Sequence, residues 1–253
     1  MTGQKRDKTK KLRLDLLLVD RGLAESREKG QAIIFAGQVL VNGQKQDKAG
    51  AVVPEDAEIR ILGETLRYVG RGGLKLEAAL REFRVPLNGK TALDVGASTG
   101  GFTDCLLQHG VQKVFAVDVG YGQLAWKLRQ DPRVVVIERV NIRDMAPSLI
   151  PEPVDIAVID VSFISLTKVI PSILNFLKPD AAMVALIKPQ FEVGKEQVGK
   201  GGIVRDETAR MTAVKNIEDF IRGLGLEVEG IVPSPITGQD GNNEYLVCAY
   251  RSR

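Results

Sequence analysis

Four charged residues lie at the ends of predicted strands and helices, and together they could take part in a proton transfer. Asp160 follows the apolar run VDIAVI, Lys188 follows AAMVALI, and Glu244 precedes YLVCAY. Lys75 opens a predicted helix in GRGGLKLEAAL. Lysines and carboxylates that converge on one point can orient one another around a weakly acidic hydroxyl group. Any one of them alone is more often a solvated rim residue, so the prediction rests on the set.

A glycine-bearing loop after the first apolar run of the C-terminal part predicts a ligand site. The segment LDVGASTGG (Leu93 to Gly101) has the spacing of neither a dinucleotide loop nor a phosphate loop. Asp94 precedes its first glycine, and Asp118 ends the next apolar run. Carboxylates suit ribose hydroxyls and cationic ligands, and they repel phosphates. The pattern therefore favours S-adenosylmethionine (SAM), which has a ribose and a sulfonium but no phosphate, over a tight turn with a coincidental aspartate.

A second segment, FEVGKEQVGKGGIVRDE (Phe191 to Glu207), resembles a nucleotide-binding loop but lacks a required feature. Gly194, Gly199 and Lys200 fit the spacing G-x-x-x-x-G-K. Gly201, however, stands where the magnesium-binding Ser or Thr should follow. We interpret the segment as a mobile lid that brings Lys200 to a substrate phosphate, with an idle flexible loop as the alternative.

Other chemistries fit the sequence less well. Two cysteines, Cys105 and Cys248, and one histidine, His109, occur in the chain, which argues against a disulfide framework and against most Cys-His or Ser-His nucleophiles. Methylation at pyrimidine C5 needs a thiolate, and both cysteines are expected inside regular elements. Enzymes that methylate amino groups of bases often have an Asn/Asp-Pro-Pro-aromatic turn after the fourth strand, where this chain has IDVSF (Ile159 to Phe163).

The C-terminal part, from Leu74 onward, alternates apolar runs with helical patterns. The predicted strands are KTALDVG, KVFAVDVG, RVVVIE, VDIAVIDVS, AAMVALIKP and EYLVCAY, and the predicted helices are GGFTDCLLQHG, YGQLAWKLRQD, ISLTKVIPSILNFLK and DETARMTAVKNIEDFIRGLG. This alternation predicts an α/β fold with a mostly parallel sheet and helices on both faces. Because such sheets bind ligands at the carboxyl ends of their strands, three of the four charged residues should meet at one edge.

Residues 12–62 form a smaller set of short elements. The helical patterns are LRLDLLLVDRGLA and ESREKGQAIIFAG, the second with Ser26 as its N-cap and its end at Gly37. A strand–turn–strand pattern, QVLVNGQKQ, and a strand within Ala57 to Leu62 follow. These elements predict a small α+β module, joined by a connector at residues 63–73 to a larger domain at residues 74–253.

The charge of the chain is mildly basic and uneven. The formal net charge is +3 and the isoelectric point is about 8.8. Residues 1–11 form a basic tail, which is either solvated or a phosphate-contacting arm. No apolar run reaches the roughly 18–20 residues of a membrane span, and no signal peptide is recognisable, so the prediction is a cytoplasmic protein.

Several segments resemble a known family. The C-terminal part resembles the FtsJ-type (RrmJ-like) ribose 2′-O-methyltransferases in RGGLKLEAAL, LDVGASTGGFTDCLL, DVSFISL, LIKPQFE and GNNEYL, and the N-terminal part resembles an S4 RNA-binding domain in RLDLLLVDRGLAESREKGQAI and GQVLVNG. Together they are similar to the TlyA family, often labelled hemolysin A, whose members methylate cytidine 2′-hydroxyls of ribosomal RNA. The resemblance covers nearly the whole chain after about Lys11, with one departure at Gly70, where Ser is expected. It implies a Rossmann-like class I SAM methyltransferase with a seven-stranded sheet.

The resemblance also implies roles for individual residues. Lys188 accepts or steers the proton of the ribose 2′-hydroxyl, Asp160 and Glu244 orient the two lysines, and no metal takes part. The implied catalytic tetrad is Lys75, Asp160, Lys188 and Glu244. The expected SAM contacts are Asp94, Gly96, Ser98, Gly100, Gly101, Phe102, Asp118 for the ribose and Asn141 for the adenine. The expected RNA contacts are Lys10, Arg13, Arg27, Lys29 and Lys200.

Two other functions stay open beside this one. A catalytically silent RNA-binding or ribosome assembly factor would keep the fold, although the intact tetrad argues against it. A membrane-lytic hemolysin is the third hypothesis, and the sequence offers no strongly basic amphipathic helix for it.

Overall fold

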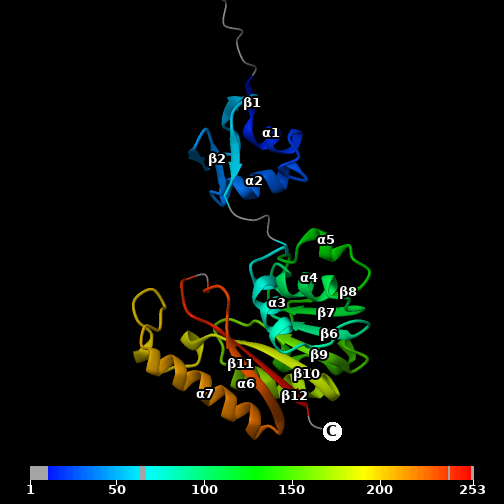
Figure 1. The fold of residues 1–253 in the computed structure, drawn as a ribbon. Coiled ribbons are helices and arrows are strands. Elements are labelled where there is room, and N and C mark those ends of the chain that lie inside the picture. The colour runs from blue at the N-terminus through cyan, green and yellow to red at the C-terminus, as the bar shows by residue number, and fades with distance from the viewer. Residues whose placement is uncertain (1–10, 63–66, 239, 252–253) are drawn as a thin grey trace, which may run out of the picture. The chain divides into compact units, whose positions relative to one another are not determined.

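The computed structural model describes residues 11–62, 67–238 and 240–251. The chain divides into two compact units, Met1–Leu66 and Arg67–Arg253, and each is described by itself (Figure 1). The basic tail, with Lys10, and residues 63–66 of the expected connector lie outside the described residues. Gly70, in the described part of that connector, has no room for a side chain without adjustment, because a Cβ there would lie 2.9 Å from the Thr99 hydroxyl.

The N-terminal unit packs two short helices against short antiparallel strands. The helix α2 begins after Ser26, whose hydroxyl accepts the Lys29 N–H at 3.3 Å, as the N-cap prediction required. Asn42 and Gly43 have φ of 49° and 77°, which is the backbone of a tight hairpin turn between β2 and β3. The elements are β1 (Lys11–Arg13), α1 (Leu14–Asp20), α2 (Arg27–Phe35), β2 (Val39–Val41), β3 (Gln44–Gln46), β4 (Val52–Pro54) and β5 (Ile59–Ile61).

Two strands of this unit were not expected from the sequence. The strands β1 and β4 pair with each other, with Leu12 opposite Val53. Each has only three residues, which is too short for an alternating pattern to stand out. Leu12 was instead assigned to the start of a helix, because the apolar spacing of α1 continues into it. The core of the unit is formed by Leu14, Leu17, Leu18, Ile34, Val39 and Val41 among others.

The C-terminal unit is built on a seven-stranded sheet in the order β11-β12-β10-β9-β6-β7-β8. The pairs among β10, β9, β6, β7 and β8 are parallel, and β12 is antiparallel to both of its neighbours. The expected Rossmann-like, mostly parallel sheet is therefore confirmed. Its strands are β6 (Thr91–Val95), β7 (Lys113–Asp118), β8 (Val134–Glu138), β9 (Val154–Ile159), β10 (Leu177–Ile187), β11 (Leu226–Pro233) and β12 (Tyr245–Arg251).

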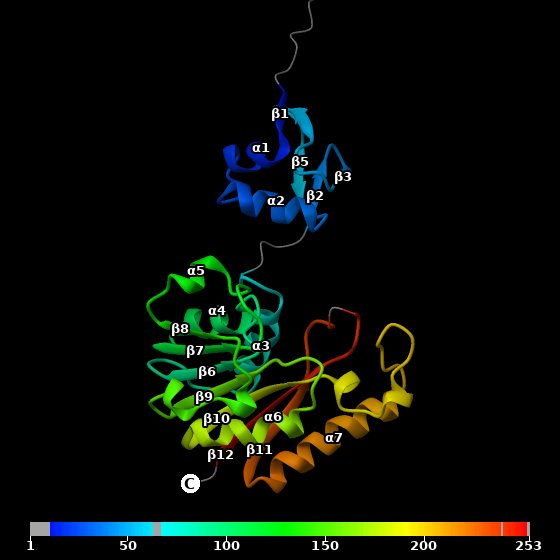
Figure 2. The ribbon, with the colours of Figure 1, turned by 180° about the vertical axis from the view of Figure 1, so that it is seen from behind.

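Helices cover both faces of this sheet (Figures 1 and 2). On one face α3 and α4 bury Leu76, Leu80, Phe102 and Leu106 against the strands. On the other face α6 and α7 contribute a second apolar cluster. The helices are α3 (Gly72–Glu82), α4 (Gly101–Gln108), α5 (Trp126–Arg129), α6 (Leu166–Ile173) and α7 (Glu207–Gly223), with 3-10 turns η1 (Ile142–Asp144), η2 (Pro147–Leu149), η3 (Leu174–Phe176), η4 (Pro189–Phe191) and η5 (Lys195–Gln197).

The strand β11 was missed from the sequence, and two helices are shorter than predicted. β11 alternates apolar residues with Glu227 and Glu229 and shifts register at Gly230, as suits a strand at the edge of a sheet. The helix α5 has four residues, and α6 passes into η3 and then directly into β10. The secondary structure of these three segments is determined by packing against the sheet more than by the spacing of their own apolar residues.

Candidate active site

The ends of three neighbouring strands bring together the charged residues that the sequence singled out. Ile159 of β9 lies opposite Ala185 of β10, and Ile187 of β10 lies opposite Tyr245 of β12. Asp160 and Lys188 come directly after β9 and β10, and Glu244 comes directly before β12. Because β12 runs antiparallel to β10, its first residue is at the same edge as the last residue of β10.

Two lysine–carboxylate pairs occupy this edge, and all four residues except the partly exposed Asp160 are buried. The ammonium of Lys75, from the first turn of α3, donates to Glu244 Oε2 at 2.5 Å. The ammonium of Lys188 lies 2.6 Å from Asp160 Oδ1 and donates to the Ser162 hydroxyl at 2.9 Å. The exposed fractions of Lys75, Lys188 and Glu244 are 8%, 9% and 4%. Buried charges of this kind persist only when they are paired, so each lysine depends on its own carboxylate.

Within the described residues, the Lys188 ammonium has a donor direction beyond its contacts with Asp160 and Ser162. A lysine ammonium has three N–H groups, and two of its contacts among the described residues are Asp160 and Ser162. Both of those partners line a cavity beside the strand ends. A hydroxyl group bound there could meet the third N–H of Lys188 while the carboxylate of Asp160 is close enough to share its proton.

The cavity has a volume of about 470 Å³, within the range of sites for small ligands. It lies at the carboxyl ends of β6, β7 and β9, where the strand order reverses, as expected for an open α/β sheet. Four of the predicted SAM contacts line it: Gly96, Ser98, Asp118 and Asn141. Asp160, Ser162 and Phe163 line it as well.

Gly96 shows why the loop after β6 needs glycine. Its φ is +85°, and a Cβ there would lie 2.3 Å from the backbone oxygen of Asp160. The N–H of Asp160 in turn donates to Val95 O at 3.0 Å. The glycine therefore lets the cofactor loop and the Asp160 turn touch, and any side chain at this position would push them apart.

The other predicted SAM contacts support the loop without lining the cavity. Gly100 has φ of +97° and precedes α4, and Gly101 opens that helix against Gly72 and Gly73 of α3. Phe102 is buried beside Gly72. These residues fix the position of the loop rather than face the cavity.

Asp94 and Asp118 differ sharply in their surroundings. Burial raises the pKa of Asp94 to about 7, although a 2.6 Å hydrogen bond from the Thr103 hydroxyl opposes this shift. Within the described part of the chain, Asp94 Oδ1 has no hydrogen-bond partner. Asp118 accepts the N–H groups of Ser98 and Gly120, each at 2.7 Å. An unpartnered acidic oxygen and a carboxylate at the cavity wall fit a ligand with a cationic group and ribose hydroxyls.

Phe163 was not among the predicted site residues. Its side chain is 90% exposed, its φ is +63°, and it stands at the cavity three residues after Asp160. Its ring meets that of Phe191 at a centroid distance of 5.2 Å. An exposed aromatic side chain is unusual, because burying such a ring normally stabilises a protein. A positive φ at a bulky residue is also rare. In the sequence Phe163 resembles a core aromatic, and its exposure is visible only in the structure.

Two of the predicted RNA contacts of the N-terminal unit, Arg13 and Arg27, share one buried carboxylate. Asp15 accepts hydrogen bonds from Arg13 at 2.9 and 3.0 Å, from Arg27 at 2.9 Å and from Gln31 at 2.9 Å. The Arg13 bond is the main reason that the pKa of Asp15 lies well below its usual range, and burial opposes it. Both arginine side chains remain about half exposed. Lys29 is exposed and pairs with Glu25.

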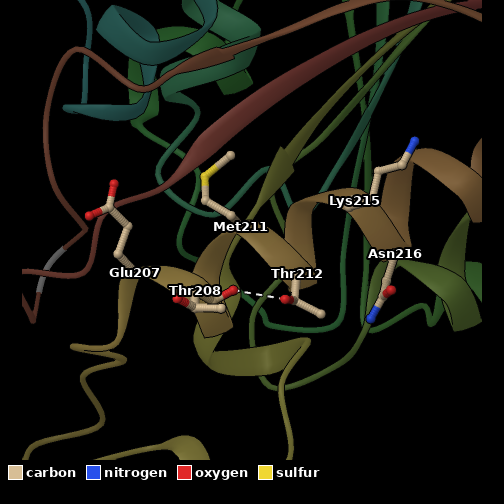
Figure 3. A pocket seen from close by; sticks show the side chains of 6 residues that line it. All are labelled: Glu207, Thr208, Met211, Thr212, Lys215 and Asn216. Carbon is tan, nitrogen blue, oxygen red and sulfur yellow. Dashed lines mark hydrogen bonds between the residues drawn. The ribbon is translucent and has the colours of Figure 1, made fainter.

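A further hollow lies along α7 and shares no lining residue with the cavity described above. Figure 3 shows its lining, with the Thr212 hydroxyl donating to Thr208 O at 2.8 Å and with Lys215 and Asn216 pointing away from each other. One helix supplies all of its lining residues, and they include none of the site residues above.

The sheet order, the cavity at the reversal point and the two amine–carboxylate pairs define a Rossmann-like methyltransferase. The chain belongs to the FtsJ-like methyltransferase family, whose model matches residues 68–251. The S4 domain model matches residues 12–59. The resemblance inferred from the sequence is thus confirmed for both parts.

Relatives of known name resemble the chain over nearly its whole length. YqxC of Bacillus subtilis, provisionally named an rRNA methyltransferase, is 51% identical over 94% of this chain and 85% of its own. The 16S/23S rRNA (cytidine-2′-O)-methyltransferase TlyA of Mycobacterium tuberculosis is 45% identical over 94% of this chain and 89% of its own. A solved chain from Streptococcus thermophilus, provisionally described as a hemolysin, is 43% identical, covers 96% of this chain and 90% of that chain, and has a TM-score of 0.75.

Proposed function

We propose that this protein transfers a methyl group from SAM to the ribose 2′-hydroxyl of cytidine in ribosomal RNA. The observation that carries the proposal is the two lysine–carboxylate contacts at the strand ends, where Asp160 also lines the cavity. The name of the M. tuberculosis relative supports the substrate. We place the reaction in the cytoplasm, where ribosomal RNA is found.

The cavity residues divide the cofactor between them in this proposal. Asp118 holds the ribose, Asn141 lies near the adenine, and the loop from Gly96 to Phe102 shapes the methionine side. Asp94 compensates the cationic part of SAM with its unpartnered oxygen. When bound, SAM supplies an electrophilic methyl group on its sulfonium.

The lysine pairs position the acceptor hydroxyl and take up its proton. Lys188 orients the 2′-oxygen through its free N–H direction, and the Lys188–Asp160 pair receives the proton as the oxygen–methyl bond forms. Lys75 and Glu244 hold the adjacent wall of the site, since their contact ties α3 to the start of β12. Positioning and proton transfer of this kind account for large rate factors without covalent catalysis. No step in this scheme requires a metal.

The RNA contacts come from cations and one aromatic ring. Arg13, Arg27 and Lys29 of the N-terminal unit contact phosphates and so give affinity without reading sequence, as do the basic tail and Lys10. Lys200 contacts a phosphate near the site. Phe163 offers a face on which a nucleobase can stack at the cavity mouth.

A methyl-transfer assay tests the proposal directly. Tritium from labelled SAM is expected to enter ribosomal RNA or ribosomal subunits with the unmodified protein and not with Lys188→Ala. Lys215→Ala is the matched control, because Lys215 is an exposed, ion-paired lysine on α7. Circular dichroism confirms folding of each variant. Failure of SAM to bind in calorimetry would refute the proposal.

The alternatives have distinct outcomes in the same experiments. SAM binding without transfer to any ribosomal substrate would favour an RNA-binding assembly factor. Release of dye from liposomes would favour the lytic activity that the hemolysin label suggests. In the described residues, none of the helices is long and apolar enough to cross a membrane.

A further inference from the structure

The glycine-rich loop at Gly199–Ile203 forms a turn closed by backbone hydrogen bonds, rather than an extended loop. The N–H of Gly199 donates to Ile203 O at 3.0 Å, and the N–H of Gly202 donates to Gly199 O at 3.1 Å. Gly201 and Gly202 have φ of +81° and +76°, which only glycine adopts freely. The turn leaves Lys200 exposed at its tip. The predicted lid is therefore compact, and it needs an anchor to affect catalysis.

Asn242 supplies that anchor. Its side chain is 1% exposed, and both ends of its amide are used on the loop. Asn242 Oδ1 accepts the Val204 N–H at 3.0 Å, and Nδ2 donates to Gly202 O at 2.8 Å. A buried amide that is satisfied at both ends in this way holds two segments in one fixed register.

The other side of Asn242 is the turn that presents Glu244. The backbone oxygen of Asn242 accepts the Gly238 N–H at 2.9 Å, and Glu244 O accepts the Ser234 N–H at 2.8 Å. A Cβ on Gly238 would lie 2.5 Å from Glu244 Oε1, so the turn packs directly on the carboxylate. A displacement of Asn242 therefore moves the group that pairs with Lys75.

We propose that Asn242 is a positioning residue that couples the position of the Gly199–Ile203 loop to that of the Lys75–Glu244 pair. An RNA phosphate bound at Lys200 then stabilises the register in which Glu244 holds Lys75. The occupant of the loop is the sugar–phosphate backbone of the substrate RNA, contacted through charge and not through base edges. This inference rests on the proposed methyl transfer.

The proposal requires that Lys200 influence turnover as well as binding. Loss of one phosphate contact alone would raise KM for RNA about equally across RNA sequences and leave kcat unchanged. If the contact also sets Glu244, Lys200→Ala lowers kcat as well, by about fivefold. Misplacement of a catalytic group by about 1 Å can lower the rate on the order of a hundredfold, so Asn242→Ala is expected to lower kcat by about tenfold to a hundredfold.

A double-mutant cycle between Lys200 and Asn242 tests the coupling. Asn242→Asp is the second background, because it has the same shape and can still accept the Val204 N–H but cannot donate to Gly202 O. In the unmodified background Lys200→Ala should lower kcat about fivefold, and in the Asn242→Asp background it should change kcat less than about twofold. Asn216→Asp, the same change at an exposed position of α7, should not alter the effect of Lys200→Ala.

Hydrogen exchange and SAM calorimetry separate the possible failures. Asn242→Ala should lose protection at the Val204 amide and keep its affinity for SAM. An equal kcat effect of Lys200→Ala in both backgrounds, or an Asn242→Asp protein that loses only thermal stability, would overturn the inference while methyl transfer by the unmodified protein still stands. Absence of transfer by the unmodified protein would instead refute the proposed function.

Discussion

The raised pKa of Asp94 leads to a prediction about stability and pH. The carboxyl group has an ordinary pKa of 3.8 and a pKa of about 7 in the folded protein, mainly because it is buried. Between these values the folded state holds a proton that the unfolded state has released. Stability therefore falls as pH rises from about 4 to about 7 and is level above that. This direction is opposite to that of an ion-paired carboxylate such as Asp15.

The magnitude follows from the size of the shift. A difference of about three pKa units corresponds to about 4 kcal/mol, at 1.36 kcal/mol per unit. Asp94→Asn removes the titration but keeps an oxygen that can accept from Thr103. The variant should match the unmodified protein near pH 4 and be more stable by up to about 4 kcal/mol at pH 8. Ionisation of the nearby Asp160 and Asp118 contributes to the shift, so the comparison uses one ionic strength throughout.

Denaturant unfolding at a series of pH values measures this difference. Trp126 is the single tryptophan of the chain and belongs to the C-terminal unit, so its fluorescence reports that unit alone. Circular dichroism provides a second probe for the two-state test. Parallel curves for the two proteins across pH 4–8 would show that Asp94 does not titrate near neutrality in the folded state, and the account of its burial would be wrong.

Three further predictions concern the cofactor, the acceptor and the small unit. SAM affinity should rise between pH 6 and pH 8, because a cationic ligand favours the ionised form of Asp94. At the lower pH, binding should release a proton, which calorimetry in buffers of different ionisation enthalpy measures. An affinity that does not change with pH would contradict this prediction. Phe163→Ala should weaken RNA binding by about 1–3 kcal/mol, the range for base–aromatic stacking. Filter binding measures this, and calorimetry should show a smaller effect on SAM binding. Asp15→Ala should destabilise the N-terminal unit by about 1–2 kcal/mol, because it removes the hydrogen bonds that the buried carboxylate accepts from Arg27 and Gln31. Hydrogen exchange of α1 and α2 measures this, and unchanged protection would count against it.

The sequence predicted the sheet and its active edge because both depend on strong local patterns. Apolar runs that end in Asp160 and Lys188 are recognisable without any tertiary information, and parallel strands must place those ends together. The partition into two pairs, Lys75 with Glu244 and Lys188 with Asp160, was not predictable, because it depends on side-chain reach across α3 and β12. The division of the cofactor loop into lining and supporting residues likewise depends on packing.

The missed features have a common physical origin. Asn242 lies in a loop whose sequence, GNNEYL, contains two adjacent asparagines, and only the contacts with Gly202 and Val204 distinguish the buried one. Phe163 resembles a core aromatic in sequence, and its exposure follows from a left-handed backbone that no spacing rule predicts. Both depend on loop conformation, which is determined by the assembled fold.

The shared carboxylate of Asp15 has a consequence for how the small unit meets a nucleic acid. Asp15 already holds the guanidinium groups of Arg13 and Arg27 in place. They therefore lose little conformational entropy when their outward N–H groups bind phosphates. The negative charge of Asp15 also lowers the positive electrostatic potential around the two arginines. The unit should therefore engage its target through a preset geometry, with a gentler dependence on salt than two free arginines would give.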